Sequence, residues 1–210
     1  MRWSVYVIFV FLSVAASAAP QSATDGRVER LKAIQADPDA LKAAQAAGRK
    51  ASFFCANCHG ENGVAKFPGV PNLAGQNPAY LLEQIRKFGS GERKDDFMQG
   101  MIKVLKEEEP AQIALFYAYS PVPPGRADAA LAAQGKMVFM RTCIQCHGER
   151  ARGNELIPRL AGQEPSYLQT ALTRYRDRTG ERNDVRMLAL AANLKNEDIA
   201  AVVQYLVQMQ

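Results

Sequence analysis

The order of apolar and polar positions along the chain predicts helices and no sheet. Apolar residues recur at helical spacing in three main segments of each half, and no segment alternates convincingly with a period of two. Asp37 and Asp128 are the expected N-caps of the first helix in each half, and Pro38 occupies a first helical position. The expected helices are 38–54, 78–89 and 110–119, then one starting after Asp128, one from Pro165 to near Gly180, and 197–208. The predicted fold class is therefore all-α.

The second half of the chain repeats the first at an offset of 87 to 89 residues. The repeated features are Gly48 and Gly135, P-x-L-A-G-Q at 71–76 and 158–163, P-x-Y-L at 78–81 and 165–168, G-E-R at 91–93 and 180–182, and Met98 and Met187. A duplicated domain explains this register. The repeated glycine favours a close crossing of the first and last helices, filled by Phe116 or Tyr117 and by Tyr205.

Composition shifts mark the boundaries of the predicted units. An Arg, an apolar run from Val5 to Val14 and small residues before Pro20 predict a signal peptide cleaved after Ala18. The alternative, a retained membrane anchor, needs a longer apolar run than this one. Val28, Leu31 and Ile34 predict a short helix without a counterpart in the second half. The predicted units are a signal peptide at 1–18, an extension at 19–37, domain 1 at 38–120, a Pro-rich linker at 121–126 and domain 2 at 127–210.

Two C-x-x-C-H motifs carry the chemistry of the chain. They consist of Cys55, Cys58 and His59, and of Cys143, Cys146 and His147. In an exported protein this pattern is typical of c-type haem attachment. The two sulfurs, one helical turn apart, reach the two vinyl groups of one porphyrin, and the histidine stands under the iron. The sequence therefore predicts two covalently attached haem c groups.

Two other uses of the cysteines are a four-cysteine zinc site and a thioredoxin-like dithiol. A zinc site has to join pairs separated by the whole span from Cys58 to Cys143 and leaves both histidines unexplained. A dithiol is expected in a β-α-β context, which the pattern lacks.

Histidine and cysteine counts limit the second ligand of each iron. The chain has two His and four Cys, all within the two motifs, so a Met thioether is the remaining soft ligand. Met187 is the candidate in the second half. In the first half Met98 shares its register, and Met101, without a partner in the repeat, is the alternative.

Two prolines follow the haem histidines at nearly equal spacing. Pro71 lies 12 residues after His59, and Pro158 lies 11 after His147. Their carbonyls are candidates to accept the imidazole Nδ1–H and fix the ring. The spacing fits ordinary turn prolines equally well.

The formal net charge of +5 is not concentrated in a long basic run. Nucleic-acid binding is therefore not expected. The arginines, ten of which lie after Pro121, fit a solvated surface with partners for haem propionates. The sharper alternative is a docking face for an acidic redox partner.

Taken together, these motifs resemble the cytochrome c4 family, dihaem periplasmic cytochromes made of two class I cytochrome c domains. The resemblance covers residues 39–210 and departs from the family at the extension 21–37. It implies two tandem all-α domains, each wrapped around one covalently bound haem, with His/Met ligation at both irons and propionate edges facing across the domain interface. It also supports the role of Pro71 and Pro158.

The expected function is single-electron transfer in the periplasm, in a soluble or loosely membrane-attached protein. A quinol-oxidising complex or a dehydrogenase is the expected donor, and a terminal oxidase the acceptor. The alternative is the electron-accepting subunit of a dehydrogenase, such as a flavocytochrome that oxidises sulfide. An enzyme in its own right, such as a dihaem peroxidase or a thiosulfate-oxidising cytochrome, is disfavoured because a Met is assignable at each iron.

Overall fold

Two groups of helices make up the chain in a computed structural model that describes residues 22–123, 125–180, 182 and 184–210. The predicted signal peptide at 1–18 lies outside the described residues. The helices of the first half are α1 (Ser22–Ala36), α2 (Pro38–Ala51), α3 (Ala56–His59), α4 (Pro78–Ser90), α5 (Asp96–Lys103) and α6 (Glu109–Ala118). Those of the second half are α7 (Ala129–Thr142), α8 (Ile144–His147), α9 (Pro165–Asp177), α10 (Val185–Ala191) and α11 (Asn196–Gln208). No strand occurs in these ranges, which confirms the all-α prediction.

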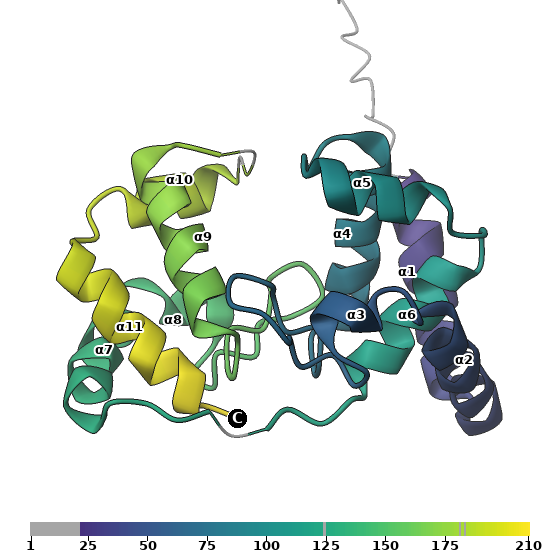
Figure 1. The fold of residues 1–210 in the computed structure, drawn as a ribbon, viewed down its shortest axis with the longest axis horizontal. Coiled ribbons are helices and arrows are strands. Elements are labelled where there is room, and N and C mark those ends of the chain that lie inside the picture. The colour runs from purple at the N-terminus through teal and green to yellow at the C-terminus, as the bar shows by residue number, and fades with distance from the viewer. Residues whose placement is uncertain (1–21, 124, 181, 183) are drawn as a thin grey trace, which may run out of the picture.

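The two groups lie side by side, with the loops that follow α3 and α8 between them (Figure 1). Each group has its own apolar core. The first core includes Leu31, Leu82 and Tyr117, and the second includes Phe139 and Leu206. None of the helices in the described ranges is long and apolar enough to cross a membrane.

Local sequence signals set the helix boundaries. The side chain of Asp37 accepts hydrogen bonds from the first backbone N–H groups of α2, and Asp128 caps α7 in the same way. α9 ends at Asp177 because Arg178 adopts a left-handed conformation (φ 54°) and closes the helix. The predicted end near Gly180 was therefore too late.

A close crossing of the first and last helices holds each half together. A Cβ added at Gly48 would overlap the carbonyl oxygen of Gln112 in α6, and one at Gly135 would overlap that of Ala201 in α11. The side chains of Phe116 and Tyr205 begin 2.9 Å from these added atoms. The repeated glycine thus lets two helix backbones touch, as its repetition predicts.

Candidate haem sites

Each cysteine–histidine motif forms a short helix. Cys55 immediately precedes α3 and Cys143 immediately precedes α8, so each motif begins at the N-cap and closes within one turn. The four thiols are partly buried and unpaired. Burial raises the pKa of Cys55, and burial together with the neighbouring Cys146 raises that of Cys143 to about 11. Each pair is presented by its own helix in a different half, as separate attachment to two porphyrins requires.

Both motif histidines are buried and held through one ring nitrogen. His59 and His147 are 7% and 5% exposed. Nδ1 of His59 lies 2.9 Å from the carbonyl oxygen of Pro71, and Nδ1 of His147 lies 3.0 Å from that of Pro158. Because a carbonyl only accepts, Nδ1 carries the proton and Nε2 keeps a lone pair. Burial lowers the pKa of both imidazoles, so both are neutral at pH 7, the form that binds iron.

The two candidate methionine ligands occupy equivalent positions on short helices, α5 and α10. Each is the third residue after an Asp N-cap: the Met98 N–H donates to Asp95 at 3.0 Å, and the Met187 N–H donates to Asp184 at 3.3 Å. The Asp caps explain why these short segments, which are not among the helices expected from the sequence, are helical. Met101 lies one turn further along α5, so it shares the face of Met98.

Backbone loops from one half are held by side chains from the other. The Asn77 side chain, just before α4, lies 2.7 to 3.0 Å from carbonyl oxygens of Arg152, Asn154 and Ile157. In the equivalent place before α9, Glu164 accepts from the backbone N–H of Gly69 at 3.0 Å. The repeat therefore marks surfaces that meet each other, a contact that the sequence analysis missed.

Comparisons with known proteins decide the family. A sequence model described as cytochrome c matches residues 132–210. Cytochrome c4 of Pseudomonas aeruginosa is 35% identical over 173 residues, covering 77% of this chain and 86% of that protein. The chain belongs to the cytochrome c4 family. The crystal structure of reduced recombinant cytochrome c4 from Pseudomonas stutzeri superposes with a TM-score of 0.72 at 32% identity, over 78% of this chain and 97% of the other.

A second kind of relative is also present. The thiosulfate dehydrogenase electron acceptor of Thiomonas intermedia is 30% identical over 185 residues, covering 80% of this chain and 83% of that protein. The sequence of this chain is thus also similar to that of a protein named for accepting electrons from an enzyme.

Membership of the cytochrome c4 family identifies the chain as an electron carrier with two covalently bound haem c groups. Each haem supplies an iron that cycles between Fe(III) and Fe(II) by one electron. The residues fit this group: each half presents two thiols one turn apart, a buried neutral imidazole with a free Nε2, and a Met on a short helix.

Cationic and phenolic side chains gather where the two halves face each other. Arg182 donates to the hydroxyl of Tyr167 and lies 5.4 Å above its ring. Burial raises the pKa of Tyr80 to about 12, whereas for Tyr167 the neighbouring Arg182 and Arg93 outweigh burial and lower the pKa. Arg93 and Arg182 come from the two G-E-R segments. Guanidinium and phenol donors suit carboxylate groups, so this cluster fits the haem propionates.

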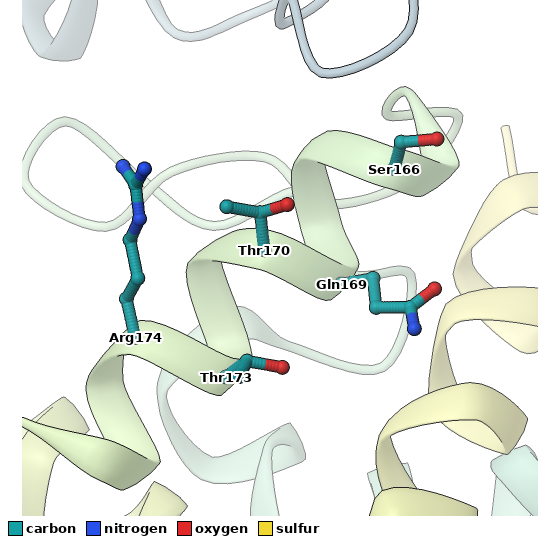
Figure 2. A pocket seen from close by; sticks show the side chains of 5 residues that line it. All are labelled: Ser166, Gln169, Thr170, Thr173 and Arg174. Carbon is teal, nitrogen blue, oxygen red and sulfur yellow. The ribbon is translucent and has the colours of Figure 1, made fainter. Parts of the chain in front are cut away.

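One surface hollow lies on α9. Ser166, Gln169, Thr170, Thr173 and Arg174 line it (Figure 2). It contains none of the cysteine, histidine or methionine residues assigned above.

Proposed function

We propose that this protein is exported to the periplasm and carries single electrons from a quinol-oxidising complex or a dehydrogenase to a terminal oxidase. His59 with Met98 and His147 with Met187 are the proposed iron ligands. The observation that carries the proposal is the equivalent placement of the two Met residues after their Asp caps, together with a histidine in each half that is fixed by a proline carbonyl. Two protein ligands at each iron favour electron transfer over binding of a substrate.

The chain's residues contribute to this function by holding the ligand set constant. Proline carbonyls at Pro71 and Pro158 fix the imidazole rings, which limits the rearrangement that accompanies each change of iron charge. Met thioethers favour the reduced iron and raise the potential, as suits a carrier late in respiration. The Arg and Tyr cluster between the halves supplies donors for the propionates.

Substitution of each Met tests the ligand assignment in the holoprotein. Met98→Ala and Met187→Ala should each remove about half of the ferric absorption band characteristic of Met-S ligation, and the double variant should remove all of it. Met101→Ala is the matched control and should leave the band intact. Loss of the band in Met101→Ala with retention in Met98→Ala would reverse the assignment, and high-spin iron in the wild type would contradict the carrier function.

Export has its own measurement. The proposed cleavage after Ala18 predicts a mature chain that starts at Ala19 and is released with the periplasmic fraction. Sequencing the N-terminus of the haem-containing protein decides this point. A retained N-terminus in the membrane fraction would instead establish the anchor.

The second candidate function is the electron-accepting subunit of a dehydrogenase. The similarity to a thiosulfate dehydrogenase electron acceptor supports it. Purification of the native protein separates the two functions: a free carrier is obtained alone, whereas a subunit is obtained with its enzyme and is reduced when that enzyme's substrate is added.

A further inference from the structure

The two P-x-L-A-G-Q segments bind each other through reciprocal hydrogen bonds across the interface. The Gln76 side chain accepts from the Arg159 backbone N–H at 2.7 Å and donates to the Arg159 carbonyl at 2.9 Å. In return, Gln163 accepts from the Asn72 N–H at 2.6 Å and donates to the Asn72 carbonyl at 3.0 Å. Both glutamines are buried, at 5% and 7% exposure. Each glutamine therefore hydrogen-bonds both backbone groups of one residue in the opposite half.

The peptide group that each glutamine binds is also the one that holds the opposite histidine. The Arg159 N–H and the Pro158 carbonyl belong to a single peptide unit. Its oxygen lies 3.0 Å from Nδ1 of His147, and its N–H donates to Gln76. The same is true of the peptide between Pro71 and Asn72, which joins His59 to Gln163.

Hydrogen bonds at the two ends of one amide strengthen each other. When the N–H of a peptide is donated in a hydrogen bond, the carbonyl oxygen of that peptide becomes more negative. The hydrogen bond that this oxygen accepts is then strengthened by roughly 10–30%. A stronger acceptor at Nδ1 makes the imidazole a more basic ligand. A more basic ligand stabilises Fe(III) and lowers the potential of that iron.

We infer that Gln76 and Gln163 are positioning residues that tune the haem of the opposite half: Gln76 the iron at His147, and Gln163 the iron at His59. This inference rests on the proposed ligation by the two histidines. It makes the two potentials properties of the assembled pair, since neither half contains the complete set of bonds around its own histidine.

Redox titration of the full-length holoprotein tests the inference, with backbone amide signals of each half reporting their own iron by NMR. Gln76→Leu should raise the midpoint potential of the second-half haem and change that of the first-half haem less. It should also shift the Nδ1 resonance of His147 in the reduced protein. Gln163→Leu should give the mirror result. Gln76→Glu keeps an acceptor oxygen for the Arg159 N–H and should not raise the potential.

Asn77→Leu is the matched control, because it removes a cross-interface side chain without touching the peptide between Pro158 and Arg159. Equal potential shifts in Asn77→Leu and Gln76→Leu would overturn the inference and assign the effect to a loosened interface. A larger shift in the haem of Gln76's own half would also overturn it. The wild-type spectrum, recorded first, shows independently whether both irons have the proposed His/Met ligands.

Discussion

The same helix face is covered in the first half and open in the second. In the first half, Ala79 and Leu82 on α4 are buried in a core that also includes Leu31 of α1. The equivalent residues of α9 are Ser166 and Gln169, which are exposed and line the hollow (Figure 2). The extra N-terminal helix thus belongs to the first core, and a polar substitution pattern on α9 makes such a cover unnecessary in the second.

The helix crossing also differs between the halves. In the first half, the large buried side chain is Tyr117 from α6, opposite the small Ser52. In the second half, the large side chain is Phe139 from α7, opposite Leu206. The buried aromatic ring thus comes from the last helix in the first half and from the first helix in the second half. The glycine contact between the two helices is the same in both.

These differences, compared with the shared haem motifs, show which positions of the repeat can hold different residues in the two halves. The halves share the cysteine–histidine motifs, the proline carbonyls that hold the histidines, and the glutamines that bind the opposite half. They differ on one face of α4 and α9, at the helix crossing, and at Asn77 and Glu164 in the interface. Mutations that act on one half alone therefore sharpen the comparison.

The largest expected effect is at the helix crossing. Phe139→Ala should destabilise the second half by about 3–5 kcal/mol because it leaves a cavity under α11. Ser52→Ala, at the equivalent position, removes only a hydroxyl that donates to the Arg49 carbonyl at 3.1 Å and should cost about 1 kcal/mol. Native-state hydrogen exchange of each half measures both. Equal losses would show that the two crossings are packed alike.

The second-largest effect is expected where α1 packs on α4. Leu31→Ala should destabilise the first half by about 2–5 kcal/mol, because Leu31 is 1% exposed within its core. Thr170→Ala in the open hollow of the second half is the control and should change stability by about 0.5 kcal/mol or less. Hydrogen exchange rates of α2 and α6 report the stability of the first half, and those of α7 and α11 report that of the second half. Comparing the two sets separates the effects of the two substitutions. A stable first half in Leu31→Ala would mean that α1 is dispensable.

The smallest effect is expected from removal of a pH-dependent ion pair in the first half. Arg86 binds Glu92 at 2.7 Å, and this hydrogen bond lowers the pKa of Glu92 to about 2 from 4.5. The carboxylate therefore stabilises the fold above about pH 4.5 and loses this contribution as the pH falls towards 2. Thr173 replaces Arg86 in the second half. Thermal unfolding should show that Glu92→Gln is less stable than wild type at pH 7 and that most of this difference is lost as the pH falls through 2. The difference between Thr173→Ala and wild type should not change over the same pH range.

Sequence reasoning reached the helices and haem motifs because their signals are local. An Asp N-cap or a C-x-x-C-H turn is complete within a few residues, and the repeat transferred each assignment to the other half. It missed the partners of Gln76 and Gln163, since the bonds join residues 83 and 91 positions apart and no periodicity encodes them. The repeat showed that both glutamines are constrained, whereas only the fold shows that they bind each other's segments.

The reciprocal glutamine bonds give this single chain the contact surface of a symmetric dimer. Each half carries both the glutamine and the backbone that receives it, so the patch is isologous and complementary to a rotated copy of itself. The chain that joins the two halves then raises the local concentration of one patch near the other. Each half thus carries both elements of the glutamine contact, whereas the neighbouring contacts of Asn77 and Glu164 differ between the halves. In the glutamine contact alone, the molecule is arranged like two subunits joined end to end.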